Sequence, residues 1–344
     1  MTLTETLTDA ARGAVTVRRA ARSYRMTAGV MLLGVAVLAA LPFLVFATVT
    51  DALVNLFVLV VLASMWNLLA GFGGLVSVGQ QAYVGIGAYS VIAFADMGVL
   101  PYLAVPLAAL TAAVFAVPTS WLAFRLRGDY FAVGTWVIAE VYRLLVVRVD
   151  ALGGGSGKSL TGLSDFDQAM RGALTYWVAL GLALGSVLVV YLLLRSRLGL
   201  SLMAVRDEET AANAVGINVG LAKRIVYLVS AAGCGAAGAV IVIASLSVNP
   251  DAIFDVQWSA YMIFIVVIGG IGYIEGPLLG AVVFFALQQT LADYGSWYLV
   301  LLGLIGILVA IRLPRGLWGL FSDRTSISLF PVGYYVDRRG RADE

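Results

Sequence analysis

The stretch that decides the fold is residues 195–224, which read RSRLGLSLMAVRDEETAANAVGINVGLAKR. It lies between two long apolar runs, residues 174–194 before it and residues 225–246 after it. A helix of about 20 apolar residues spans the hydrocarbon core of a bilayer. The pattern therefore predicts two membrane-spanning helices joined by a polar loop. Basic residues at both ends of that loop predict that it lies in the cytoplasm.

A short helix is expected inside this loop. Asp207 is a favourable N-cap, because its carboxylate accepts the free N–H groups of a first helical turn. Glu208 and Glu209 then lie at the positive end of the helix dipole. The alanines of residues 211–214 favour helix, and Gly216 is a natural left-handed stop. Because a helix of about two turns is marginal alone in water, we expect it to pack either on a second, soluble subunit or on the protein's own loops.

The composition excludes several classes of protein. Of the 344 residues, 61% are hydrophobic and 12% are charged, which is about half the charged fraction of soluble domains. The sequence has no histidine and one cysteine, Cys234, which excludes a disulfide framework and a thiolate metal cluster. The net charge of +2 argues against binding to nucleic acid. Continuous rather than alternating apolar runs predict an all-α polytopic membrane protein.

The apolar runs predict about 8–10 transmembrane helices, with both chain ends in the cytoplasm. The expected spans are residues 29–49, 52–70, a segment ending near 97, 102–124, 130–149, 174–194, 225–246, 259–269, 278–290 and 297–311. A tight turn is expected at Thr50 and Asp51, and the spans at 259–269 and 278–290 are short enough to form a re-entrant pair instead. Outside a transmembrane domain of residues 28–318, we expect a basic amphipathic arm at 1–27 on the inner membrane face and a cytoplasmic tail at 319–344.

Two glycine-rich segments, residues 71–90 and 269–280, are expected to break the helices. Small residues let helices approach closely, and irregular backbone in a membrane is tolerated only where protein shields it or it lines a cavity. The first segment carries polar side chains that either line a translocation pathway or bond to neighbouring backbone: Ser77, Gln80, Gln81 and Tyr83. A likeness between the stretches Gly98 to Pro106 and Gly272 to Pro277, in segments of opposite orientation, predicts an inverted repeat.

Two charges stand inside an apolar run. Glu140 and Arg143 are three residues apart within residues 130–149, and so share one helical face. A lone charge at the centre of a membrane helix costs roughly 2.5–3.5 kcal/mol, so both side chains should face protein or water. They are either gate or pathway charges, or an internal ion pair that fixes helix packing.

The loop at residues 150–173 is expected on the outer face, where it contacts an external partner or shapes the outer mouth. It contains GGGSGKS, which is similar to a phosphate-binding loop. The phosphate-binding spacing GxxxxGK[ST] needs glycine at position 152, where this chain has Leu152. We therefore reject nucleotide binding at this loop.

Six segments in a fixed order carry a family resemblance. They are GGLVSVGQQAYVGIGAY (73–89), RLRGDYFAV with AEVYRL (125–144), GGGSGKSLTGL (153–163), SRLGLSLMAVRDEETAANAVGINV (196–219), VVIGGIGYIEGPLLGA (266–281) and LPRGL (313–317). With these segments the chain resembles the LivM-type permease subunits of branched-chain amino acid ABC importers, over roughly residues 50–320.

The resemblance implies a heteromeric transporter. Its other parts would be a LivH-type permease, two cytoplasmic ABC ATPase subunits that bind ATP and Mg²⁺, and an external substrate-binding protein. This chain would hold no cofactor of its own and would not be an enzyme. The solute would be a branched-chain amino acid or a related small polar molecule such as urea or an amide. The region that contacts the ATPase would be a coupling helix with Arg206, Asp207, Glu208, Glu209, Ala212 and Gly216.

Two rival functions stay open at this point. A stand-alone secondary transporter or channel would use Glu140 and Arg143 as ion-coupling charges. An intramembrane enzyme is less favoured, because the chain has no histidine and the spans have no clustered catalytic polar set.

Overall fold

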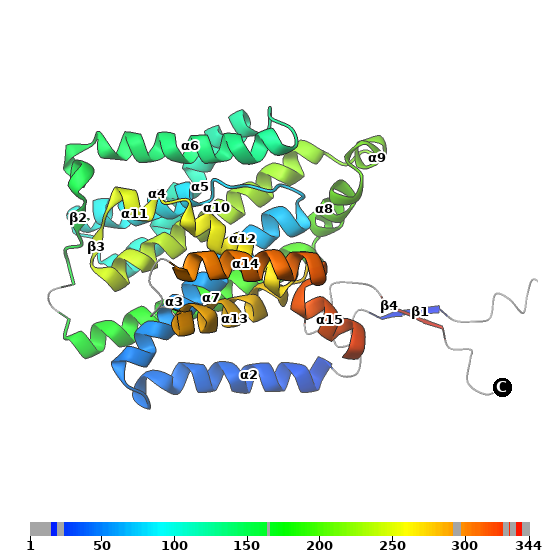
Figure 1. Cartoon of the computed structure of the whole chain (residues 1–344), viewed down its shortest axis with the longest axis horizontal. Coiled ribbons are helices and arrows are strands. Elements are labelled where there is room, and N and C mark those ends of the chain that lie inside the picture. The colour runs from blue at the N-terminus through cyan, green and yellow to red at the C-terminus, as the bar shows by residue number, and fades with distance from the viewer. Residues whose placement is uncertain are drawn as a thin grey trace, which may run out of the picture. The chain divides into compact units, whose positions relative to one another are not determined.

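The structure is a computed structural model that describes residues 15–18, 24–163, 166–291, 297–325, 330 and 335–338. The chain divides into two compact units, one of Ala39–Ser326 and one of Met1–Leu38 with Ile327–Glu344. The larger unit is a helical bundle (Figure 1). Within the described residues, seven helices are long and apolar enough to cross a membrane, and Leu33–Phe43 and Gly276–Leu291 are shorter apolar segments. The prediction of an all-α polytopic membrane protein is therefore confirmed.

The helices of the larger unit are α3 (Ala47–Asn67), α4 (Gln81–Asp96), α5 (Pro101–Ala123), α6 (Asp129–Val147), α7 (Gln168–Arg195), α8 (Arg197–Asp207), α9 (Glu209–Ala214), α10 (Val219–Ser245), α11 (Pro250–Ile253), α12 (Gln257–Gly269), α13 (Gly276–Leu291), α14 (Trp297–Arg312) and α15 (Gly316–Thr325). The long helices of the larger unit overlap the predicted spans, and α8, α9, α11 and α15 are additional short helices. Short 3₁₀ turns occur at Leu41–Phe43, Asp150–Leu152 and Gly154–Ser156, and a π-helical turn at Leu68–Phe72 follows α3.

The smaller unit contains the strand β1 (Val15–Arg18), the strand β4 (Tyr335–Arg338) and most of α2 (Tyr24–Ala40). The two strands pair antiparallel, with Val15 opposite Arg338. The predicted arm and tail thus each contribute a strand. Residues 1–14, 19–23, 331–334 and 339–344 lie outside the described residues, so the amphipathic character of the arm stays a prediction.

The expected turn at Thr50 and Asp51 is wrong. Both residues lie inside α3, which begins at Ala47, and the connection from α2 runs through the 3₁₀ turn at Leu41–Phe43. The hydroxyl of Thr50 donates to the carbonyl oxygen of Ala47 at 2.7 Å. Its polar group is therefore satisfied within the helix, and a threonine in this first turn does not end it.

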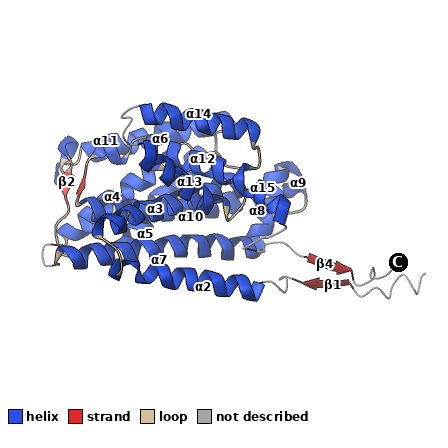
Figure 2. Cartoon of the chain, turned by 60° about the horizontal axis from the view of Figure 1, so that its bottom comes forward, coloured by secondary structure: helices blue, strands red, loops and turns tan. Residues whose placement is uncertain are grey.

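The core of the bundle lies around α10, which packs against α3, α4 and α5 (Figures 1 and 2). Glycines make the approach to α4 close. A Cβ on Gly87 would collide with the carbonyl oxygen of Gly235, and a Cβ on Gly238 would collide with that of Val84. This is the close packing that small residues permit between membrane helices.

The loops collect at two ends of the bundle (Figure 1). At one end the strand β2 (Lys158–Ser159) pairs with the strand β3 (Ser247–Val248), so the loop predicted outside is joined to the loop that follows α10. At the other end α9 and the connection between α5 and α6 line one cavity. The structure therefore separates the loop at residues 150–173 from the loop at residues 195–224, and which end is cytoplasmic stays a prediction.

The second break is shorter than expected. Residues 270–275 separate α12 from α13, and Pro277 is the second residue of α13 rather than part of the break. Proline is well tolerated in a first helical turn, where its missing N–H is not needed. Gly98 and Gly272 both have positive φ, 85° and 79°. Pro106, however, lies inside α5, so the two prolines occupy different positions and the inverted repeat stays a prediction.

Candidate functional site

The polar loop at 195–224 forms two short helices, α8 and α9, rather than one. Ser196 caps α8, with its hydroxyl oxygen accepting from the N–H of Leu198 at 3.2 Å. The predicted N-cap at Asp207 is wrong, because Asp207 is the last residue of α8. Glu208 caps α9 instead: its carboxylate accepts from the backbone N–H of Thr210 at 3.4 Å and from the Thr210 hydroxyl.

One small apolar cluster holds α9 to the rest of the chain. Ala212 is buried and packs with Val205 of α8 and Val219 of α10. The other residues of α9 are exposed, and the side chain of Val215, just after the helix, is 76% exposed. Gly216 has φ 85°, the left-handed conformation expected of a helix stop. Apart from Ala212, the side chains of α9 are thus open to solvent in this chain.

A cavity of about 1180 Å³ opens beside α9. Its walls come from α9, from residues 74–76 and from the connection between α5 and α6, including Arg127 and Asp129. Glu209 and Lys223, which also line it, form an ion pair at 2.7 Å. The cavity therefore lies at the foot of the exposed helix and has an ion pair in its wall.

The six predicted contact residues divide into three kinds of position. Asp207, Glu208, Glu209 and Gly216 are exposed. Ala212 is buried against its own chain. Arg206 is partly exposed, and its Nη1 donates to the carbonyl oxygen of Gly71 at 3.0 Å. Whether any of them contacts a second subunit stays a prediction.

The four polar residues predicted near the pathway are buried within the bundle. Ser77 accepts from the N–H of Gly79 at 3.2 Å, and its carbonyl oxygen accepts from the indole of Trp66 at 2.8 Å. Tyr83 shares a hydrogen bond with Tyr227 of α10 at 2.9 Å. The carboxamides of the two glutamines reach different helices. The oxygen of Gln81 accepts from Ser259 of α12, and that of Gln80 lies 3.5 Å from the hydroxyl oxygen of Ser230 on α10.

These contacts connect α4 to α10 and α12, which is the packing alternative of the sequence analysis. The amide nitrogen of Gln80 is buried and has no hydrogen-bond partner among the described residues. None of the four side chains lines the cavity beside α9. A direct role of Ser77, Gln80, Gln81 and Tyr83 in transport therefore stays a prediction.

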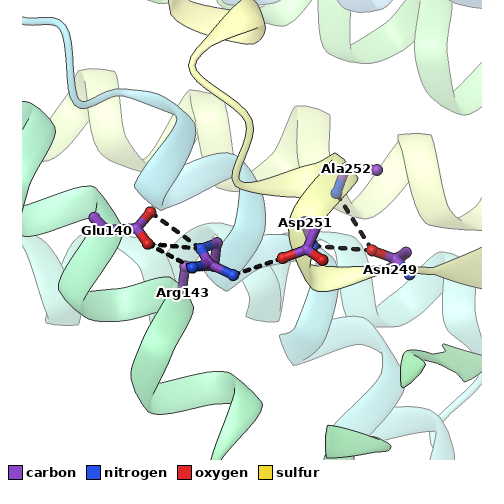
Figure 3. A network of polar contacts seen from close by, with 5 residues as sticks. All are labelled: Glu140, Arg143, Asn249, Asp251 and Ala252. Carbon is purple, nitrogen blue, oxygen red and sulfur yellow. Dashed lines mark hydrogen bonds and ion pairs between the residues drawn. The ribbon is translucent and has the colours of Figure 1, made fainter. Parts of the chain in front are cut away.

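Glu140 and Arg143 form an ion pair that extends to a third residue (Figure 3). The Nε of Arg143 lies 3.0 Å from both carboxylate oxygens of Glu140, and its Nη1 donates to Asp251 of α11 at 2.5 Å. Asn249 caps α11, accepting from the N–H groups of Asp251 and Ala252. The arginine therefore links α6 to the capped turn after β3. The side chains remain partly exposed, 48% for Glu140 and 25% for Arg143.

Three residues that the sequence analysis did not single out carry much of this architecture: Asn67, Ser230 and Asp251. Asn67 and Ser230 are buried, and each forms a hydrogen bond to another segment of the chain. A signal for Asn67 was present, since it is an amide near the end of a strongly apolar run. Asp251 follows an Asn-Pro pair that is typical of a capped turn, but nothing local indicated its partner on α6.

Comparisons with known proteins agree with the resemblance. A family profile described as "Branched-chain amino acid transport system / permease component" matches residues 48–310. The chain is 28% identical over 303 residues to the high-affinity branched-chain amino acid transport system permease protein LivM of Escherichia coli (strain K12), covering 80% of this chain and 71% of that protein. It is 26% identical over 284 residues to the fructose import permease protein FruG of Bifidobacterium longum, covering 77% and 82%. No solved structure gave a significant match.

Proposed function

The chain belongs to the family of permease components of branched-chain amino acid transport systems, and on this premise we propose that it is the membrane subunit of an ATP-driven importer. Its solute would be a branched-chain amino acid or a related small polar molecule. The names of the relatives include both branched-chain amino acid and fructose transport. We therefore assign selectivity largely to an external binding protein rather than to this chain.

The exposure of α9 is the observation that supports ATP hydrolysis by a partner subunit as the energy source. Two turns of helix are marginal alone in water, yet α9 packs on its own chain mainly through Ala212. Its other residues are exposed, and Glu208 and Glu209 give it an acidic tip. These features support docking of α9 into a cleft of a soluble ATPase subunit, two copies of which would hold ATP and Mg²⁺.

The distribution of charge supports a cytoplasmic position for α9. Basic residues flank the helices and the cavity at this end of the bundle: Arg125, Arg127, Arg195, Arg197, Lys223 and Arg224. Short loops rich in Lys and Arg stay on the cytoplasmic side of a membrane. An ATPase bound here would lie on the side where ATP is available, and both chain ends would lie on that side too.

The exposed face of α6 supports a second permease. Only 17% of its most apolar stretch is buried within this chain. Glu140 and Arg143 lie partly exposed on this helix. Charges facing lipid are costly, so this face is better explained by a LivH-type partner or by a water-filled pathway between the two permeases. Movement of the docked helices would then open that pathway alternately to each side.

The test is uptake by the assembled complex in liposomes, with ATP inside and the binding protein outside. We expect Glu208→Lys together with Glu209→Lys to abolish uptake while the protein still inserts. Because Glu209 pairs with Lys223, Lys223→Met is the matched control: it breaks the same ion pair but leaves the acidic tip, and should retain uptake. Full uptake by the double variant would contradict the docking, and uptake without ATPase subunits would favour a stand-alone transporter.

A further inference from the structure

Three segments from distant parts of the chain meet beside the end of α8. They are the π-helical turn Leu68–Phe72, the break at residues 270–275 and the last turn of α8. Asn67 joins the first two. Its Oδ1 accepts from the N–H of Gly272 at 2.9 Å, and its Nδ2 donates to the carbonyl oxygen of Tyr273 at 2.8 Å. Since an amide has distinct donor and acceptor ends, this pair of bonds fixes one arrangement of the two segments.

The fit between these segments leaves no room for a side chain. A Cβ on Gly71 would lie 2.7 Å from the nitrogen of Gly272. Gly272 itself has φ 79° and Gly270 has φ 124°, conformations that other residues rarely adopt. The π-helical turn and the break are therefore held together as one unit, although more than 200 residues separate them in sequence.

Arg206 connects α8 to this unit. Its Nη1 donates to the carbonyl oxygen of Gly71 at 3.0 Å, and a Cβ on Gly272 would lie 3.1 Å from the same nitrogen. The guanidinium therefore forms a hydrogen bond to the π-helical turn and lies beside Gly272 of the break. Only Asp207 and Glu208 lie between Arg206 and the first residue of α9, so a displacement of α9 reaches this arginine over a very short length of backbone.

We propose that Arg206 is a positioning residue that transmits movement of α9 to the π-helical turn and to the break at residues 270–275. We also propose that Asn67 makes these two segments, the two helix breaks, move together. The inference rests on the proposed function, because it assumes that an ATPase moves α9. π-helical turns and other interruptions are the places where helices bend. Arg206 would act within its own chain, in contrast to a residue that only touches the ATPase.

The test uses the complete complex, with both permeases and the ATPase subunits, in liposomes. Arg206→Ala should leave ATPase subunits bound and hydrolysing ATP while lowering uptake, roughly two- to thirtyfold for a lost coupling contact. Arg206→Lys should recover part of the uptake, because an ammonium still donates to the Gly71 carbonyl. Arg197→Ala, a change at an exposed arginine in the first turn of α8, is the matched control and should behave as the wild type.

A second readout separates transmission from a merely structural role. In the wild-type complex a non-hydrolysable ATP analogue should change hydrogen exchange in α9, at residues 68–74 and at residues 270–275. In Arg206→Ala the change should remain in α9 and disappear from the two breaks. Asn67→Asp, which loses one of the two amide bonds, should weaken the joint response of the breaks.

Each outcome decides one claim. Loss of bound ATPase in Arg206→Ala would make Arg206 a docking contact and overturn the inference, as would a parallel fall in yield, hydrolysis and uptake. If the wild-type complex takes up solute and Arg206→Ala takes up as much, the inference about Arg206 would be overturned and the proposed function would stand. A wild-type complex that takes up no solute with ATP would overturn the proposed function itself.

Discussion

Arg143 on α6 donates to the carboxylate of Asp251 on α11 at 2.5 Å, joining two residues 108 positions apart in the chain. The same guanidinium holds Glu140 one helical turn away. Arg143 therefore joins α6 to the turn that follows β3. The side chain of Asp251 is 74% exposed, so solvent screens this pair substantially.

The first prediction measures this link. A double-mutant cycle of Arg143→Ala and Asp251→Ala should give a coupling free energy of about 0.2–1 kcal/mol, the range for exposed ion pairs. The measurement is thermal unfolding in detergent. Arg143→Ala alone should destabilise the protein more than Asp251→Ala alone, because it also leaves Glu140 without its partner. Independent effects of the two substitutions would show that the pair does not join α6 to α11.

The second prediction concerns the contact between α4 and α10. Gly238→Ala should destabilise the protein by about 1–3 kcal/mol, the usual cost of overpacking, because the added methyl would collide with the Val84 carbonyl oxygen. Gly181→Ala on α7 is the control, since a Cβ there has nothing within 4 Å. Fluorescence-detected size-exclusion chromatography after heating compares the two. Equal melting of both variants would mean that the helices do not approach this closely.

The third prediction is a pH dependence of α9. Hydrogen bonds from the Thr210 hydroxyl and N–H lower the pKa of Glu208. A carboxyl whose pKa is lower in the folded state stabilises that state above its unfolded pKa of about 4.3, and this contribution is lost as pH falls through the folded pKa. Hydrogen exchange at α9, corrected for intrinsic rates, should therefore accelerate below about pH 4.3. Glu208→Gln cannot titrate and should remove that step; its persistence would assign the step to another group.

The fourth prediction fixes the orientation. Val215→Cys, at an exposed position after α9, should react with a membrane-impermeant maleimide only after cells are permeabilised. Thr161→Cys, exposed at the opposite end of the bundle, should react in intact cells. The native Cys234 is buried and should contribute little background. The reverse labelling pattern would place α9 outside and remove the case for a cytoplasmic ATPase.

Local patterns were sufficient to predict the spans, because hydropathy acts over a window of about one membrane thickness. The same holds for Gly216, whose positive φ follows from its position after a short alanine-rich helix. The cap was misplaced because residues 197–207 are themselves helical. Because α8 continues through Asp207, the N-cap of α9 is Glu208. The local sequence did not distinguish Asp207 from Glu208 as the capping residue.

Local sequence patterns could not predict the contacts between distant parts of the chain. Nothing in the residues around Asn67 specifies that its amide binds Gly272, and nothing around Arg143 specifies Asp251. These pairings follow from how α3, α6, α11 and the break between α12 and α13 are arranged in space. The burial of Ser77, Gln80, Gln81 and Tyr83 is likewise a property of the bundle, since a polar stretch rich in glycine is compatible with a wet lining or a dry interface.

The hydrogen bond between Tyr83 and Tyr227 spans 144 positions of the chain, which sets an order on biosynthesis. A ribosome adding about 5–20 residues per second takes roughly seven to thirty seconds to travel from the first tyrosine to the second. During that interval α4 and α5 have left the ribosome, but α10, which packs between them and α3, has not been made. The surfaces of α4 and α5 that α10 will cover must be sheltered by lipid, the translocon or a chaperone until α10 is made, so a stall in translation before residue 219 would expose the protein to degradation.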